Sequence, residues 1–428
     1  MPDAPITKIE DANPNVADKP AKAKAKGKHS PLVTALELLV LTPIAVLILE
    51  GLFTCIGVGE QNFMSPDLEL GSVHIPGKLV TWRLEGYSRD SLSKAGWRDI
   101  ERTIAKPANT YRVALLGDSA TEALQVPMEQ TFARLSEKKI NQDLATKNSG
   151  KSEKNYPNVE VINFGVSGYS TSQELLLLQK EVLQYKPDLI VVLYSRGDSD
   201  ESSIEPAKYE MAEPRPYFYL DQNNKLQLDR TVLLANKEKL TRNELLEFLR
   251  ANSRIYGVYD QTNFQLNLTD KVYVKLRRLA TQISNKVKAM SKGSSNTDAK
   301  TAVDETPPQV PPQEKFKITQ ALLSQIQSTA KAHDANFLLL TFPDMGNIDP
   351  VFSKQIPELL QQGKAEGFGV IELSQPFRDY KGKDDVFYQV HFASGGHKVT
   401  AEVLAKYVED LIAAKQNGSQ SLSEPKAQ

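Results

Sequence analysis

The chain has 428 residues, of which 40% are hydrophobic and 25% are charged, and both fractions are typical of globular proteins. Its formal net charge of −1 gives no overall electrostatic attraction to nucleic acid. The single cysteine, Cys55, excludes an internal disulfide and any cysteine-based metal cluster. The length allows one large domain or two of ordinary size.

The N-terminal region combines a basic tail with a long apolar segment. Residues 1–30 are polar and rich in alanine and proline, and we expect them to be disordered. Five lysines lie in this tail shortly before the apolar segment: Lys19, Lys22, Lys24, Lys26 and Lys28. Residues 31–56 contain no Lys or Arg and are long enough to cross a bilayer. The pattern predicts a transmembrane signal anchor with a cytoplasmic N-terminus and a translocated main domain.

Other interpretations of the apolar segment stay open. A cleaved signal peptide would have a shorter apolar region and a small-residue cleavage site, which is not evident after Phe53. Lipid attachment at Cys55 is the second alternative, although Thr54 stands where a Gly or Ala is expected. The third alternative is a buried helix of a soluble protein.

Beyond the anchor, strands and helices alternate. Short apolar runs predict five buried parallel strands, at residues 113–116, 159–164, 189–193, 337–342 and 370–373. Helical periodicity is found at residues 132–144, 171–185, 318–332, 350–362 and 397–413. This alternation predicts a three-layer α/β/α sandwich around a mostly parallel five-stranded sheet.

Residues 203–315 interrupt the alternation. Their first part carries aromatic segments, which suggest a folded cap or side element. Residues 291–315 are rich in Ser, Thr, Pro and Gln and predict a flexible loop. Residues 417–428 have a similar composition and predict a disordered tail. The sequence therefore predicts a main domain at 66–416 with an insertion.

The segment Tyr111–Thr121 places a serine directly after a predicted strand. The apolar run ends at Gly117 and is followed by Asp118 and Ser119. Open α/β sheets bind ligands at the carboxyl ends of their strands, and a helix N-terminus behind a serine favours a nucleophile. Gly-Asp-Ser is also common in ordinary turns, so both interpretations stand for this tripeptide alone.

Four sequence blocks in this order resemble those of the SGNH/GDSL hydrolase superfamily. They are GDSAT at 117–121, VINFGVSGYSTSQE at 161–174, KPDLIVVLYSRGDSD at 186–200 and VHFASGGH at 390–397. The segments LELG at 68–71 and GWRD at 96–99 are similar to the lead-in of its membrane-anchored bacterial members. The resemblance implies a flavodoxin-like fold and a serine hydrolase that uses neither cofactor nor metal.

The resemblance also implies roles for individual residues. Ser119 corresponds to the nucleophile, and its backbone N–H to one donor of the oxyanion hole. Gly168 corresponds to a second backbone donor, with Gly165 as the other register. His391 corresponds to the catalytic base, because an imidazole can take the serine proton and return it to the leaving group. His397 corresponds to a histidine that opens the final helix and is expected to be structural.

Two departures from the family pattern affect the expected site. The family carries an acid two or three residues before its catalytic histidine, where this chain has Gln389 and Tyr388. Asp384 and Asp385 lie nearby, and Asp385 is the candidate orienting acid. The alternative is a Ser–His dyad whose ring is oriented by a backbone carbonyl.

The second departure concerns the oxyanion hole. An asparagine of the third family block corresponds to Gly197, which has no side-chain donor, and Arg196 is a candidate replacement. Losing one such donor typically costs about 10²–10³ in kcat. Gly197 still completes the expected oxyanion hole, together with Ser119 and Gly168.

Three classes of function follow. The leading one is a membrane-anchored extracytoplasmic serine esterase acting on an acyl ester, with an envelope polysaccharide or a lipid as the candidate substrates. The second is an O-acyltransferase of the same fold, because one acyl-enzyme can serve both reactions. The third is a non-catalytic relative that acts as a binding or assembly protein. None of them involves nucleic acid.

Overall fold

The computed structural model describes residues 31–56, 58–59, 62–148, 157–204, 213–237, 244–266, 312–345 and 349–416. The chain divides into two compact units, Met1–Ile56 and Gly57–Gln428, and each is described by itself. The predicted tails at 1–30 and 417–428 and residues 291–311 of the predicted loop lie outside the described residues. The last residues of that loop, 312–315, are helical, because α11 (Pro312–Ala332) begins at Pro312.

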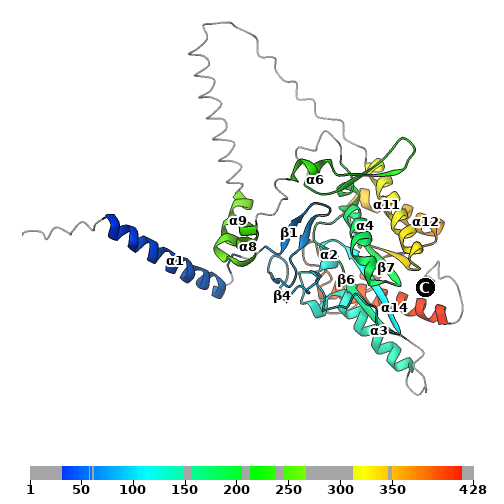
Figure 1. Ribbon diagram of the computed structural model, residues 1–428. Helices are drawn as coiled ribbons and strands as arrows, with labels where there is room; N and C mark the ends of the chain where they lie inside the picture. Colours follow the sequence, from blue (N-terminus) through cyan, green and yellow to red (C-terminus); the bar gives the residue numbers. More distant parts are fainter. Residues whose placement is uncertain are drawn as a thin grey trace, which may run out of the picture. The chain divides into compact units, whose positions relative to one another are not determined.

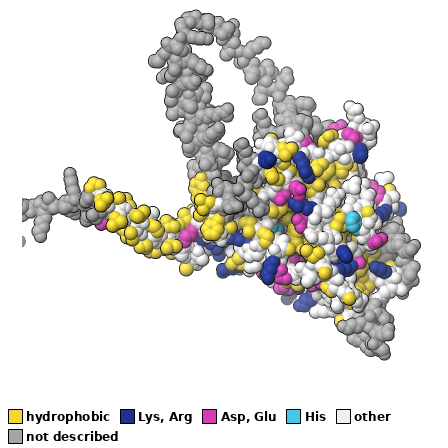
Figure 2. Space-filling model, viewed as in Figure 1, with side chains coloured by type: hydrophobic (Ala, Val, Ile, Leu, Met, Phe, Trp, Pro, Cys, Tyr) yellow, Lys and Arg dark blue, Asp and Glu magenta, His cyan; other side chains and the backbone are white. Residues whose placement is uncertain are grey.

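The first unit contains one long helix, α1 (Pro31–Ile56), with Pro43 inside it. Hydrophobic side chains cover this helix on every visible side (Figure 2). Its stretch Ala35–Ile56 is long and apolar enough to cross a membrane, and none of its most apolar window is buried. The helix has the bounds that the sequence predicts.

The second unit is built on a five-stranded parallel sheet (Figure 1). Its strands are β5 (Thr110–Gly117), β6 (Asn158–Asn163), β7 (Leu189–Tyr194), β10 (Asn336–Thr341) and β11 (Gly369–Glu372). They lie in the order β11-β10-β7-β5-β6, and every neighbouring pair is parallel. This is the flavodoxin-like order, in which the second strand lies on one side of the first and the later strands lie on the other. The predicted fold class is therefore confirmed.

Two groups of helices cover the sheet. One group consists of α3 (Phe132–Asn148) and α14 (Ser394–Gln416), which pack against each other. The other group consists of α4 (Thr171–Lys180), α11 (Pro312–Ala332) and α12 (Pro350–Glu366), and α11 contacts both of its companions. In Figure 1 the two groups lie on opposite sides of the sheet, which gives the three layers.

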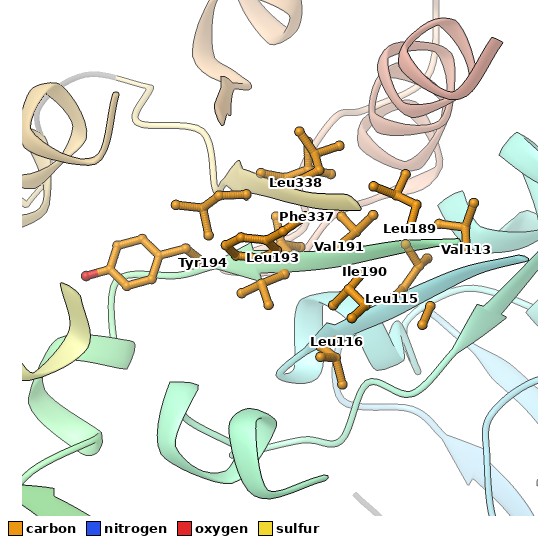
Figure 3. Packing of buried hydrophobic residues seen from close by; sticks show 14 of the residues in the cluster. Val113, Leu115, Leu116, Leu189, Ile190, Val191, Leu193, Tyr194, Phe337 and Leu338 are labelled. Carbon is orange, nitrogen blue, oxygen red and sulfur yellow. The ribbon is translucent and has the colours of Figure 1, made fainter. Parts of the chain in front are cut away.

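The core lies in the middle of the sheet, where strands have apolar residues on both faces. Every residue of β7 is buried, and side chains of β5, β7 and β10 pack together (Figure 3). A parallel strand covered by helices on both faces is apolar throughout, without the alternation of a half-exposed strand. Because the apolar runs are continuous, each observed strand begins and ends within three residues of the predicted positions.

Two antiparallel hairpins precede the sheet and were not predicted. They pair β1 (Met64–Asp67) with β2 (Gly71–His74), and β3 (Leu79–Trp82) with β4 (Ser88–Ser91). The folded unit therefore includes residues before the predicted boundary at 66. Both hairpins are fastened to the main domain: the Tyr169 hydroxyl donates to the Ser72 carbonyl at 2.6 Å, and the Ser88 hydroxyl donates to the Leu124 carbonyl at 2.6 Å.

The insertion contains its own elements. They are a hairpin of β8 (Tyr217–Leu220) and β9 (Leu226–Asp229), followed by α6 (Thr231–Ala235), α8 (Glu244–Asn252) and α9 (Arg254–Leu266). Short helices also occur at α5 (Asp198–Glu201) and α13 (Ser374–Asp379). Helix α11 begins at Pro312, six residues before the predicted helix.

His397 is buried in the first turn of α14, where its Nδ1 accepts a hydrogen bond from the Phe132 N–H at 3.3 Å. Burial, and then the positive charge of Arg98, lower the pKa of His397 to about 3. The unfolded chain binds a proton near pH 6.5 and the folded chain does not, so stability falls as the pH falls from 6.5 towards 3.

We expect the lowered pKa of His397 to reduce the free energy of unfolding by about 2 kcal/mol between pH 7 and pH 5. Urea unfolding of residues 57–428 at both pH values measures the loss. In the His397→Asn variant the side-chain oxygen keeps an acceptor near the Phe132 N–H but does not titrate. The variant should therefore lose about 2 kcal/mol less unfolding free energy than the wild type between the two pH values. Equal losses of unfolding free energy in the wild type and the variant would mean that His397 does not cause the pH dependence.

Candidate active site

The candidate site lies where the strand order reverses. In a sheet of this order, ligands bind outside the carboxyl ends of the strands at the switch point, here between β5 and β7. Ser119 lies two residues after the end of β5, and Ser195–Gly197 follow β7. The fold therefore brings the first and third sequence blocks to one edge of the sheet.

Ser119 begins the short helix α2 (Ser119–Glu122), and Asp118 is its N-cap. The Asp118 carboxylate accepts a hydrogen bond from the Ala120 N–H at 2.9 Å and one from the Ser195 hydroxyl at 2.8 Å. Burial raises the pKa of Asp118 above its usual value, although both hydrogen bonds favour the ionised form. Asp118 thus caps the serine-bearing helix and ties it to the loop after β7.

His391 lies beside Ser119, although 272 positions separate them in the chain. Its Nε2 is 2.8 Å from the Ser119 hydroxyl oxygen. The loop that carries the ring is a tight turn, in which the Tyr388 N–H donates to the His391 carbonyl at 2.9 Å. The next residue, Phe392, is fully buried and stacks on Phe342 with ring centroids 4.8 Å apart. Buried aromatic packing therefore fixes the position of the imidazole.

The other ring nitrogen of His391 contacts a carboxylate that the sequence analysis did not select. Glu85, in the loop between β3 and β4, places its Oε2 2.7 Å from His391 Nδ1. The two side chains are only 11% and 18% exposed, so water screens this contact weakly. Serine hydroxyl, imidazole and carboxylate thus form a continuous line of contacts.

The structure places Asp385, the candidate orienting acid of the sequence analysis, against the start of α14. Asp385 is exposed, and its backbone carbonyl accepts a hydrogen bond from the Gly395 N–H at 2.9 Å at the start of α14. The carboxylate at the ring comes from Glu85, which precedes the sheet in the chain. Gln389 is also exposed. The absence of an acid just before His391 was the only signal in the sequence that a carboxylate from elsewhere could take this place.

The Glu85 loop is held against the segment that follows α2. The Tyr87 N–H donates to the Gln125 carbonyl at 3.1 Å, next to the bond between Ser88 and Leu124. Gly86 has a φ of +65°, and a Cβ there would lie 2.1 Å from the Gln125 carbonyl oxygen. Only glycine allows this approach, so the backbone on both sides of Glu85 is fixed.

If the line of contacts from Ser119 through His391 to Glu85 is catalytic, Gly86→Ala should lower ester turnover by about 10²-fold, because the loop must move and a shift of about 1 Å in a catalytic group has an effect of that size. The measurement is kcat on an activated aryl ester. Gly77→Ala is the matched control: its φ is +68°, but a Cβ there would meet nothing within 4 Å. Equal losses in the two variants would mean that backbone strain, and not displacement of Glu85, causes the effect.

The two candidate glycines of the second block have different surroundings. Gly168 is exposed in a turn with a φ of +78°, and a Cβ there would meet nothing within 4 Å. A Cβ on Gly165 would lie 2.4 Å from the Glu122 backbone nitrogen. Gly165 therefore allows close packing against α2, whereas no described atom closes the space beside Gly168.

Glu122 fixes the turn that carries Gly168. Its Oε2 accepts hydrogen bonds from the Ser167 N–H, at 2.8 Å, and from the Ser167 hydroxyl, while Oε1 lies 2.9 Å from His74 Nε2. Burial alone would raise the pKa of Glu122, but His74 and Ser167 lower it below its usual value. One buried carboxylate on α2 thus connects the turn to the first hairpin.

The third block contributes a backbone turn at Gly197. Gly197 is the N-cap of α5 with a φ of −77°, so it can offer only its peptide groups. The Asp198 carboxylate accepts a hydrogen bond from the Ser195 N–H at 2.5 Å, and this bond fixes the turn. The Arg196 guanidinium lies 5.7 Å from the centroid of the Phe342 ring, in cation–π geometry. Among the described residues, no group of three His, Cys, Asp or Glu side chains could hold a metal ion.

The strand order is flavodoxin-like, and the four sequence blocks that resemble those of the SGNH/GDSL hydrolase superfamily follow one another along this fold. No family model and no curated protein matches the sequence.

Three solved structures are similar to part of the chain. One is a lipase/acylhydrolase from Enterococcus faecalis, with 14% identity, a TM-score of 0.35, and coverage of 70% of this chain and 96% of that one. Another is a putative lipolytic protein of the G-D-S-L family from Desulfitobacterium hafniense, with 11% identity, a TM-score of 0.34, and coverage of 69% and 98%. The third is a mutant acetylxylan esterase from Geobacillus stearothermophilus, with 11% identity, a TM-score of 0.34, and coverage of 71% and 95%.

Proposed function

We propose that the protein is a membrane-anchored serine esterase with Ser119 as nucleophile, His391 as general base and Glu85 as the orienting acid. The observation that carries the proposal is the line of contacts in which Ser119 Oγ lies 2.8 Å from His391 Nε2 and His391 Nδ1 lies 2.7 Å from Glu85 Oε2. Both distances are those of hydrogen bonds, and this is the geometry that activates a serine.

The acylation step follows from this geometry. Ser119 Oγ attacks the carbonyl carbon of the ester while His391 Nε2 takes its proton. The positive imidazole is stabilised by Glu85, which also holds the tautomer with a proton on Nδ1. The backbone N–H groups of Ser119 and Gly168 stabilise the oxyanion, and Gly197 is the candidate for a third. The intermediate collapses, and the alcohol leaves with the proton from His391.

Deacylation reverses these roles. His391 takes a proton from water as the water oxygen attacks the acyl carbon, and it returns this proton to Ser119 Oγ when the acid leaves. Because Gly197 lacks a side-chain donor, the oxyanion depends on backbone amides alone. An acyl ester is therefore the proposed substrate class, with an envelope polysaccharide or a lipid as its two candidate sources.

The anchor completes the proposal. Helix α1 spans the membrane, with the lysine-rich segment at 1–30 in the cytoplasm and the catalytic unit on the other side. A reporter fused after Gln416 should be active only outside the cytoplasm. A reporter that is active in the cytoplasm would contradict this topology.

The direct test of the chemistry is labelling of the purified full-length chain with a fluorophosphonate probe. We expect the wild type to be labelled and to cleave an activated aryl ester, and Ser119→Ala and His391→Ala to lose both activities. His333→Ala is the control, because among the bonds described the His333 ring contacts only the Thr329 carbonyl of the helix that precedes it. A wild type that reacts with neither reagent would overturn the proposal in favour of a non-catalytic binding protein.

A further inference from the structure

Helices α8 and α9 carry large apolar side chains that the second unit leaves exposed. Leu245 and Phe248 are 68% and 62% exposed on α8. They are three residues apart, so they lie on one face of the helix. Tyr259 on α9 is 52% exposed and packs beside Tyr256, with ring centroids 5.6 Å apart. We call Leu245, Phe248 and Tyr259 the α8–α9 surface, and Figure 2 shows hydrophobic side chains in this region.

The chain that follows α1 is fastened directly to α9. Gly59 is buried with a φ of +67°, and a Cβ there would lie 2.1 Å from the Arg254 carbonyl oxygen and 2.9 Å from a Val258 methyl carbon. Arg254 Nη1 donates a hydrogen bond to the Gly59 carbonyl at 3.4 Å. Such close packing of backbone on backbone needs a glycine, so this point of the chain cannot move freely away from α9.

Covalent reach then limits how far α9 can be from the end of α1. Only three peptide steps separate Ile56 from Gly59, which is at most about 11 Å of fully extended chain. A 26-residue helix is about 39 Å long, close to the full thickness of a bilayer with its headgroups. If α1 spans the bilayer, Gly59 and the part of α9 packed on it therefore lie at or just outside the headgroup layer.

We infer that the α8–α9 surface docks on the outer leaflet of the membrane that α1 crosses. Leu245 and Phe248 enter the interfacial layer, and Tyr259 lies at headgroup level, where tyrosine is enriched in membrane proteins. The inference rests on the proposed role of α1 as an anchor. Its consequence is that the catalytic unit is held in one orientation at the membrane surface, because a tether and a docking surface together prevent free rotation.

The single cysteine makes a sharp test possible. Cys55→Ser gives a background without thiols, into which Leu245→Cys is introduced and labelled with an environment-sensitive fluorophore. The full-length protein is reconstituted in phosphatidylcholine–phosphatidylglycerol vesicles that contain doxyl lipids with the quencher at a shallow or a deep position. Leu234→Cys is the matched control, because Leu234 is 65% exposed on α6 of the same unit. Ile48→Cys reports on α1 itself.

We expect the label at 245 to emit at shorter wavelength than the label at 234, and to be quenched more by shallow than by deep doxyl lipids. The label at 234 should not be quenched. Quenching at 48 without quenching at 245 would overturn the docking surface while leaving the anchor in place. No quenching at 48 would overturn the anchor, and the inference with it. A blue shift at 245 that depends on protein concentration and resists doxyl lipids would assign the surface to a second copy of the chain and overturn the inference.

Discussion

Glu85→Gln should lower kcat for an activated ester by about 10³–10⁴-fold with little change in KM. The amide keeps the size of the side chain but cannot stabilise a protonated His391, and it favours the wrong tautomer of the ring; a loss of about 10⁴ is known for the corresponding change in a serine protease triad. The Glu85 side chain is only 11% exposed and its Oε2 lies 2.7 Å from His391 Nδ1, so bulk water does not take over the role of the carboxylate at this nitrogen.

Asp385→Asn is the matched control for this experiment. Asp385 is the acid that the sequence favours, yet it is exposed and holds the start of α14 through its backbone carbonyl. We expect this variant to retain nearly full kcat. If Asp385→Asn is as damaging as Glu85→Gln, or if Glu85→Gln is fully active, the ring is oriented by another group during turnover.

Arg98→Met should reduce the free energy of unfolding by about 3–5 kcal/mol, because it removes one partner of a buried charged network. The Arg98 side chain is fully enclosed and donates to the backbone carbonyls of Glu122, Ala123 and Val126 at 3.0, 2.5 and 2.6 Å, and to the Asp90 carboxylate at 2.9 Å. Methionine fills part of the space but satisfies none of these acceptors, and buried acceptors without donors are costly.

Urea unfolding of residues 57–428 at neutral pH measures this effect. Lys139→Met is the control, because Lys139 pairs with Asp143 on the surface of α3 and both side chains are close to half exposed. Such a pair contributes less than about 1 kcal/mol. A loss for Arg98→Met that is no larger than the loss for Lys139→Met would mean that the carbonyls of residues 122–126 are satisfied without the guanidinium.

The strands of the sheet were predictable because a strand that is buried on both faces appears in the sequence as a continuous apolar run. β7 has six apolar or aromatic residues in succession, and its neighbours β5 and β10 are nearly as uniform. Ser119 and His391 were selected as a pair because the first and last sequence blocks resemble those of the SGNH/GDSL hydrolase superfamily. Their distance of 2.8 Å agrees with the expectation that the parallel sheet brings them together.

Glu85 was not predictable by the same means. It lies between two four-residue strands, β3 and β4, which are too short for a periodic pattern to appear. Its contact with His391 spans 306 positions, and no local rule connects residues so far apart. The physical clue is the close approach of Gly86 to Gln125, which is visible only once the backbone is folded.

The order of the three groups along the chain has a consequence for biosynthesis. The carboxylate at 85 and the hydroxyl at 119 emerge early, whereas the imidazole emerges 272 residues after the hydroxyl. A nascent or stalled chain that ends before residue 391 carries the serine without its base, whatever else has folded. If Ser119 and His391 act together as proposed, hydrolytic capacity arises late in translation, once His391 has emerged and the helix that follows it can pack on the sheet.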